Sequence, residues 1–282
     1  MTVVDAHVHV FAAVSERFPR DVHELYPADL EARAEELLAE MEAAGVDRAV
    51  LVPLSYHDEY LQHSLAQFPG RFAGIGLQPP GPIDVEAYRR RRESVGLQGI
   101  RLFSLGEPGA TRPAELATWP LLAELAATGD KLWFYGGKEQ MRLLELVLAE
   151  LPELTVVLNH LGFWPSALDV DEHGRPRFDA TYTADGLEAV RGLARFTRVF
   201  VLVSGMYAFS AERPPYDDLR PVTSGILDAF GAHRLLLATD FPWIRSEPGY
   251  AETLAAHEAH FDGLDAADRA RIRGENALEL FF

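Results

Sequence analysis

The sequence predicts an α/β protein, a (β/α)8 TIM barrel that forms a single domain over residues 1–282. Short apolar runs alternate with helical patterns from one end of the chain to the other. A length of 282 residues suits one large domain, because barrels of this kind typically use about 250 residues. No Gly/Ser linker or break in composition divides the chain. A doubly wound open sheet would show the same alternation and is the alternative.

Eight runs rich in apolar and β-branched residues are the predicted strands. Several are apolar almost throughout, which is typical of parallel strands that are covered on both faces. They comprise residues 3–10, 49–54, 72–77, 99–103, 131–135, 154–159, 199–203 and 235–239.

Helical patterns lie between these strands. Apolar residues at three-and-four spacing from Leu30 to Met41 indicate a helix that Gly45 closes in the left-handed conformation. Thr118 is a suitable N-cap for a second helix, which ends before Gly129. Three further helices are predicted over residues 139–151, 218–230 and 265–282.

Two connections are longer than the usual length of about two to six residues in such folds. They span residues 161–183 and 207–217, and both follow the carboxyl end of a predicted strand. Because the carboxyl ends of barrel strands form the functional face, we expect both loops to cover a substrate.

Charge and composition restrict the kinds of partner. Lys and Arg number 26 against 43 Asp and Glu, for a formal net charge of −17. This negative net charge disfavours binding to nucleic acid and anionic membranes and favours a small-molecule substrate.

The absence of cysteine excludes disulfides and thiolate ligands, which leaves histidines and carboxylates as the candidate catalytic and metal-binding groups. No secretory signal or apolar run of about 18 residues is present, so we expect a cytoplasmic protein.

The first predicted strand carries a pair of histidines. It reads Asp5-Ala6-His7-Val8-His9, and the period of two in a strand places His7 and His9 on the same side. Two imidazoles that point together can share one metal ion or one substrate oxygen. Two satisfied core histidines are the alternative, but burying both rings without a partner is costly.

Two more polar side chains follow other strands. His160 comes directly after the sixth strand, and Asp240 after the eighth. Taken singly, His160 could cap a strand and Asp240 could begin a turn before Pro242. Barrel closure, however, brings the eighth strand beside the first, so we expect Asp240 to lie next to His7 and His9.

Several motifs resemble a known family over nearly the whole chain. Besides the Asp-Ala-His-Val-His strand, they are Asn159-His160-Leu161-Gly162, Val203-Ser204-Gly205-Met206, Ala238-Thr239-Asp240-Phe241-Pro242 and Gly274-Glu275-Asn276-Ala277. In this order they resemble the amidohydrolase-related branch of the amidohydrolase superfamily. The resemblance implies a TIM barrel and a hydrolase or, in one subgroup, a metal-dependent decarboxylase of aromatic or muconate-type acids.

The fifth strand departs from the metal-binding relatives. They usually carry a further histidine at its end, where this chain has Trp133-Phe134-Tyr135-Gly136-Gly137. The pattern is closer to the lactonases typified by 2-pyrone-4,6-dicarboxylate lactonase and the sugar lactonases. In that group, some members work without a metal, and the strand histidines hydrogen-bond the substrate carbonyl.

Residue chemistry leaves two arrangements of the site open. His7, His9 and Asp240 could bind one Zn²⁺, or the imidazole N–H groups could stabilise the developing oxyanion without any metal. The missing histidine in the fifth strand favours the second. In both, Asp240 is the predicted general base and His160 polarises the carbonyl or orients the substrate.

Three further residues are predicted to bind substrate. Arg101 is a cation inside an apolar strand and requires an anion. That anion is either an internal carboxylate or the substrate, and the resemblance implies an arginine that grips a substrate carboxylate. Tyr135 and Ser204 lie at strand ends, where a hydroxyl could donate to substrate, although ordinary packing would explain each of them too.

The predicted function is hydrolysis of a lactone or similar activated carbonyl of a small organic acid or sugar. A divalent-metal-dependent decarboxylase, with His160 as acid and base, is one alternative. A barrel that binds a ligand without catalysis is the other. Trp164 and Tyr216 are expected to be exposed and leave room for a homodimer. The remaining histidines, His257 among them, are assigned to the surface by default.

Overall fold

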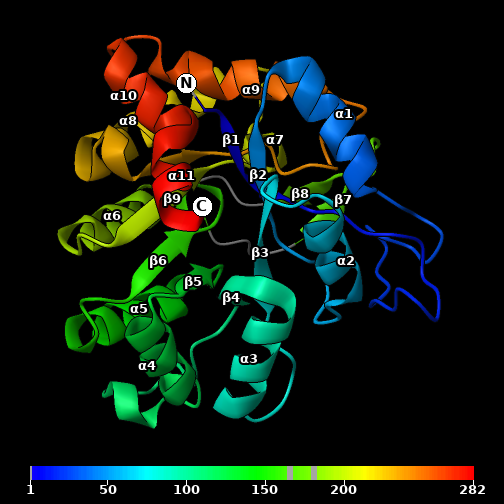
Figure 1. Cartoon of the computed structure of the whole chain (residues 1–282). Helices are drawn as coiled ribbons and strands as arrows, with labels where there is room; N and C mark the ends of the chain where they lie inside the picture. The colour runs from blue at the N-terminus through cyan, green and yellow to red at the C-terminus, as the bar shows by residue number, and fades with distance from the viewer. Residues whose placement is uncertain (1, 164–167, 179–182) are drawn as a thin grey trace.

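The computed structural model describes residues 2–163, 168–178 and 183–282, and it contains a barrel of eight parallel strands (Figure 1). Their order around the barrel is β1-β2-β3-β4-β5-β6-β9-β10. The bounds are β1 (Val4–Val8), β2 (Arg48–Leu51), β3 (Phe72–Leu77), β4 (Leu97–Leu102), β5 (Lys131–Phe134), β6 (Thr155–Leu158), β9 (Val199–Val203) and β10 (Leu235–Leu237).

The ring closes between β1 and the residues that follow β10. The N–H of His9 donates to the carbonyl of Phe241 at 2.7 Å, and the N–H of Asp240 donates to the carbonyl of His7 at 3.0 Å. An open doubly wound sheet has no such contact between its first and last strands. The predicted barrel is therefore confirmed, and the open sheet is excluded.

Helices surround the strands (Figure 1). They are α1 (Ala34–Ala44), α2 (Glu59–Gln67), α3 (Val85–Arg91), α4 (Trp119–Thr128), α5 (Lys138–Glu150), α6 (Ala184–Gly192), α7 (Met206–Phe209), α8 (Arg220–Phe230), α9 (Tyr250–Glu258), α10 (Ala266–Ala270) and α11 (Asn276–Phe281). Short 3-10 or π segments accompany them, including η3 (His160–Gly162), which follows β6, and η8 (Arg271–Glu275), which joins α10 to α11.

The predicted elements differ from the observed ones mainly at their ends. Strands β6 and β10 end before His160 and Asp240, where the backbone leaves the extended conformation, with φ of 43° and 65° respectively. The predicted last helix over residues 265–282 is divided by η8. Gly274 lies so close to the carbonyl oxygen of Thr2 that a Cβ would overlap it, and the close approach requires glycine there.

The long connection after β6 contains a small hairpin that the sequence did not predict. β7 (Leu168–Val170) and β8 (Pro176–Phe178) pair antiparallel. The Asp171 carboxylate closes the turn between them by accepting the N–H groups of His173 and Arg175, each at 2.9 Å. The predicted loop over residues 161–183 is therefore partly ordered as a sheet, and its residues 164–167 and 179–182 lie outside the described part.

Apolar side chains form two layers. The inner layer fills the barrel with small and β-branched residues around Trp133. Phe281 of α11 packs on Trp133, with ring centroids 6.0 Å apart, and α11 lies across this end of the barrel (Figure 1). The outer layer packs the strands against the helices. The end that α11 covers carries no predicted site residue, so the chemistry is confined to the opposite end.

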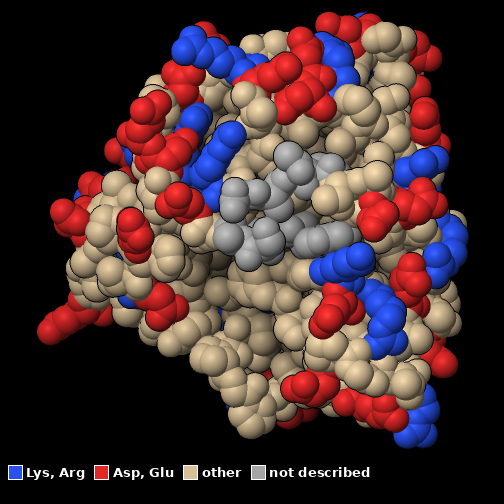
Figure 2. All heavy atoms as spheres, turned by 180° about the vertical axis from the view of Figure 1, so that it is seen from behind, with Lys and Arg blue, Asp and Glu red and all other residues tan. Residues whose placement is uncertain are grey.

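Figure 2 shows the molecule from behind, with acidic side chains distributed around the rim of that face and fewer basic ones among them. This distribution agrees with the net charge of −17. Within the described ranges, no helix has the length and apolar character needed to cross a membrane.

Two surface assignments made from the sequence are wrong. His257 is fully buried, because positions 250, 253, 254 and 257 lie on the face of α9 that packs against the barrel. Tyr216 is also buried, with 3% of its surface exposed, so it offers no apolar patch for a dimer. Trp164 lies outside the described residues.

Burial of His257 predicts a loss of stability in mild acid. Burial lowers the pKa of His257 to about 3, whereas an unfolded histidine titrates near about 6.5. Between these values only the unfolded chain binds the proton, so stability falls as the pH drops. Between pH 7 and 5 we expect the wild type to lose about 2 kcal/mol more than His257→Leu in urea unfolding. Equal losses in both proteins would contradict the assignment.

Candidate active site

The two histidines of β1 lie inside the barrel at its open end. His7 is fully buried, and His9 is 3% exposed. Nδ1 of His9 lies 2.5 Å from the carbonyl oxygen of Val52. Since a carbonyl only accepts, His9 donates from Nδ1, and its Nε2 is the ring nitrogen left for a ligand.

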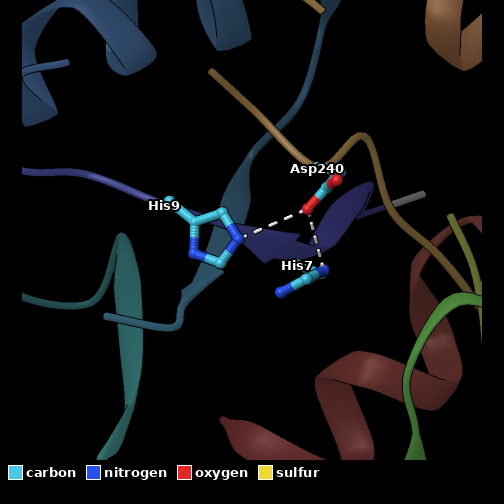
Figure 3. Close-up of side chains that lie close together, drawn as sticks. All are labelled: His7, His9 and Asp240. Carbon is cyan, nitrogen blue, oxygen red and sulfur yellow. Dashed lines mark ion pairs between the residues drawn. The ribbon is translucent and has the colours of Figure 1, made fainter. Parts of the chain in front are cut away.

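Asp240 lies beside this pair, as the sequence predicts. Its Oδ1 is 3.4 Å from Nδ1 of His7 and 3.3 Å from Nε2 of His9 (Figure 3). The other oxygen, Oδ2, accepts a 2.6 Å hydrogen bond from the hydroxyl of Tyr207 and lies 3.9 Å from Nε2 of His160. The two carboxylate oxygens therefore face different groups.

Asp5, which the sequence analysis did not assign to the site, fixes the position of Asp240 relative to β1. Its carboxylate accepts the N–H and the hydroxyl of Thr239 at 2.9 and 2.5 Å, and the hydroxyl of Tyr250 at 2.8 Å. These bonds fix the chain just before Asp240 against β1. Asp5 precedes His7 by two residues, so the strand period that predicted the histidine pair could also have identified it.

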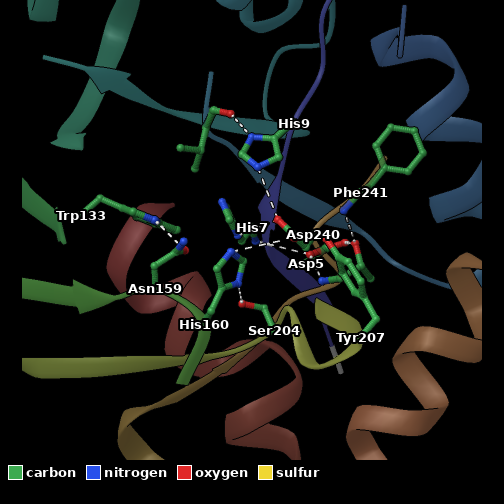
Figure 4. Close-up of polar contacts among 12 residues, drawn as sticks. Asp5, His7, His9, Trp133, Asn159, His160, Ser204, Tyr207, Asp240 and Phe241 are labelled. Carbon is green, nitrogen blue, oxygen red and sulfur yellow. Dashed lines mark hydrogen bonds and ion pairs between the residues drawn. The ribbon is translucent and has the colours of Figure 1, made fainter. Parts of the chain in front are cut away.

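His160 enters the site from the end of β6. Its Nδ1 lies 2.9 Å from the Ser204 hydroxyl (Figure 4). Gly205 allows this approach, because a Cβ there would overlap the His160 ring, and its φ of 67° also favours glycine. Burial lowers the pKa of His160 to about 4, so the ring is neutral near pH 7. With Nε2 directed toward a carboxylate, the favoured tautomer carries its proton on Nε2 and accepts from Ser204.

The electrostatics keep the Asp240 carboxylate ionised beside His7 and His160. Burial and the neighbouring His9, His160 and Arg101 side chains lower the pKa of His7 well below its ordinary value. Burial by itself would raise the pKa of Asp240, but its contacts with the imidazoles and the Tyr207 hydroxyl outweigh this effect and lower that pKa. Asp240 is thus an anion at neutral pH and can accept a proton.

Unsatisfied polar atoms show that the group fits a cation. Within the described residues, both ring nitrogens of His7 and Oδ1 of Asp240 are buried without a hydrogen-bond partner. Nε2 of His9 lies 3.3 Å from Oδ1 of Asp240, and a cation bound between these two atoms would be coordinated by both. Tetrahedral zinc ligands at about 2.0–2.1 Å from the metal are themselves about 3.3 Å apart. The ligand atoms of His7, His9 and Asp240 lie within 4.8 Å of one another.

The fifth strand supplies no ligand. Trp133 occupies the barrel interior there, with its ring centroid 5.5 Å from that of His7. Its indole N–H donates to Oδ1 of Asn159 at 3.3 Å. A cation at the histidine pair would therefore have open coordination positions on the side of β5.

Arg101 on β4 is buried, with 6% of its surface exposed. Among the residues that the structure describes, it has no ion-pair partner, and its Nε has no hydrogen-bond partner. Its guanidinium carbon lies 4.8 Å from the ring centroid of Phe103 and 5.3 Å from that of Tyr135. The internal salt bridge that the sequence left open is not formed within this set, so the buried charge is available to an anionic ligand.

Tyr135 and Ser204 differ in their surroundings. The Tyr135 hydroxyl is buried without a hydrogen-bond partner among the described residues, and its ring centroid lies 5.3 Å from that of His160. It is thus free to donate to a ligand. Ser204 instead contacts His160 and orients that ring.

Tyr207 was missed by the sequence analysis, which assigned it only to a long loop. It belongs to α7 and is 2% exposed. On its other side, a cavity of about 600 Å³ lies between the β7–β8 hairpin and residues 212–216. No sequence signal beyond its place after the Ser204-Gly205-Met206 motif pointed to this residue.

Comparison with known proteins gives a family match and structural neighbours. A family model described as amidohydrolase matches residues 4–282, and no curated protein matches the chain. A Pseudomonas putida structure described as a 2-pyrone-4,6-dicarboxylic acid hydrolase is 23% identical, with 99% of this chain and 97% of that chain covered and a TM-score of 0.74.

Two further structures are similar in the same way. One, from Acinetobacter baumannii, carries the same description, contains citric acid and is 18% identical, with 100% and 99% coverage and a TM-score of 0.76. The other is a Burkholderia multivorans amidohydrolase with bound zinc, 19% identical, with 99% of both chains covered and a TM-score of 0.73. Likeness at these identities establishes the fold and leaves the substrate open.

Proposed function

The chain belongs to the amidohydrolase family, and we propose that it is a hydrolase that opens a lactone or similar activated carbonyl of a small organic acid or sugar. The observation that carries the proposal is the convergence of His7, His9, His160 and Asp240 at one end of the barrel. Base, donor and acceptor groups meet there at a buried site, an arrangement that suits acyl hydrolysis. The description of the Pseudomonas putida neighbour as a hydrolase of a pyrone acid also supports it.

In the proposed reaction, Asp240 takes a proton from water as the water oxygen bonds to the substrate carbonyl carbon. His160 donates from Nε2 to the carbonyl oxygen, which gains negative charge. The ring C–O bond then breaks, and Asp240 returns its proton to the leaving oxygen. The product is a hydroxy acid, so one water is consumed and Asp240 is regenerated.

We further propose that His7, His9 and Asp240 hold one divalent cation, with Zn²⁺ the best match to two nitrogens and one carboxylate. When bound, such a cation supplies Lewis acidity and favours nucleophile formation at neutral pH. The unpartnered atoms of His7 and Asp240 support this proposal.

Arg101 is the proposed anchor for a substrate carboxylate. Replacing it with methionine is expected to raise KM about 10- to 100-fold for a carboxylated lactone, because a hydrogen bond to a charged group contributes about 1.5–3 kcal/mol. The turnover number should change little, since the carboxylate is bound equally before and during the reaction. Steady-state kinetics on a carboxylated and a neutral lactone test this, with the neutral one as control. Equal effects on both substrates would contradict the assignment.

A panel of sugar lactones and carboxylated pyrones tests the function itself. Ring opening releases acid, which a pH indicator records, and CO₂ is measured in parallel. Ring opening without CO₂ is the expected result. Release of CO₂ alone would favour the decarboxylase alternative, and tight binding without turnover would favour a barrel that only binds its ligand.

A further inference from the structure

Tyr207 contacts the proposed base from outside the histidine motifs. Its hydroxyl lies 2.6 Å from Oδ2 of Asp240 (Figure 4). A tyrosine hydroxyl carries its proton at neutral pH and therefore donates to the carboxylate oxygen, and a hydrogen bond of this length to a charged acceptor is a strong one.

The β7–β8 hairpin holds Tyr207 in place. Nη1 of Arg177 donates to the Tyr207 carbonyl at 2.7 Å. The guanidinium carbon of Arg175 lies 5.3 Å from the centroid of the Tyr207 ring. Because the backbone and the ring are both held, the hydroxyl has a fixed direction toward Asp240.

The hydrogen bond makes the two oxygens of Asp240 inequivalent. Oδ2 is engaged by Tyr207, while Oδ1 faces His7 and His9 and has no hydrogen bond to any described residue. A carboxylate can bind a cation through one oxygen or through both. Without the Tyr207 hydroxyl, no hydrogen bond from a described residue would keep Oδ2 from turning toward the cation site that Oδ1 faces.

We propose that Tyr207 is a positioning residue that reserves Oδ2 and restricts Asp240 to contact a cation through Oδ1 alone. The inference rests on the cation site proposed above and is independent of the substrate. The two oxygens of Asp240 then have different roles: Oδ1 holds the cation, and Oδ2 stays directed toward His160.

The test uses Co²⁺ alone as the probe, with Tyr207→Phe and a matched control. Tyr88→Phe is that control, because the Tyr88 hydroxyl donates to the buried Asp130 at 2.8 Å, away from the site. In Tyr207→Phe, Asp240 should bind through both oxygens, so the coordination number rises and the visible absorption of Co²⁺ weakens by about twofold or more. Loss of the hydrogen bond from Tyr207 to Asp240 should also weaken Co²⁺ binding about 10-fold.

The control should keep the wild-type spectrum and affinity. Near-ultraviolet circular dichroism of the metal-free proteins verifies that both variants are folded, and Phe retains the ring that packs at each position. A Tyr207→Phe spectrum and affinity equal to those of Tyr88→Phe would overturn the proposal, as would a wild type that binds no Co²⁺. Failure to hydrolyse lactones would instead count against the proposed function, since the spectra require no substrate.

Discussion

Replacing Asp240 with asparagine is expected to lower the turnover number for lactone hydrolysis at least about 100-fold. The amide has nearly the shape of the carboxylate but cannot take a proton from water near neutral pH. It also removes the negative charge that faces His7 and His9 at 3.4 and 3.3 Å. Steady-state kinetics on the best lactone of the panel measure the effect.

A matched variant separates this effect from a loss of folding. Asp130 is also buried, with 3% exposed, and it accepts a hydrogen bond from Tyr88 away from the site. Asp130→Asn can lower stability but should leave the turnover number of the folded fraction unchanged. If Asp240→Asn retained about a tenth or more of wild-type turnover, Asp240 could not be the general base.

Removal of metal is expected to lower the turnover number about 100-fold or more, and addition of Zn²⁺ should restore it. The physical reason is that buried atoms of His7 and Asp240 have no hydrogen-bond partner among the described residues, and a cation would satisfy them. Metal content and rate are measured together after chelation and again after addition of Zn²⁺.

A histidine variant locates the metal within the chain. His9→Gln removes the ring nitrogen that lies 3.3 Å from Oδ1 of Asp240 and should lower the bound metal to a small fraction of one ion per chain. His233→Gln, at an exposed histidine, should retain it. Full turnover in protein freed of metal would instead support the arrangement in which imidazole N–H groups alone stabilise the oxyanion.

The main features of the fold and most of the residues of the site could be predicted because they follow from local rules. A strand repeats every two residues, so His7 and His9 had to share a side wherever the strand lay. Closure of an eight-stranded barrel then placed Asp240 beside them. The structure brings all three together, and His160 joins them through its contact with Asp240.

Other features depended on how irregular segments pack. The orientation of Tyr207 is set by the β7–β8 hairpin, which the sequence did not predict. The tautomer of His9 depends on the carbonyl of Val52, a backbone group that no pattern of side chains reveals. Burial of His257 follows from the face that α9 presents to the barrel.

By itself, the sequence predicted the strands, favoured a closed barrel over an open sheet and identified the side chains at the carboxyl ends of the strands, because these features follow from local periodicity. Only the tertiary structure decided which atom of each side chain faces which neighbour. That Arg101 lacks an internal counter-ion among the described residues, and that the two oxygens of Asp240 face different partners, are properties of contacts between distant segments. Such contacts are fixed by packing in three dimensions and leave no periodic trace along the chain.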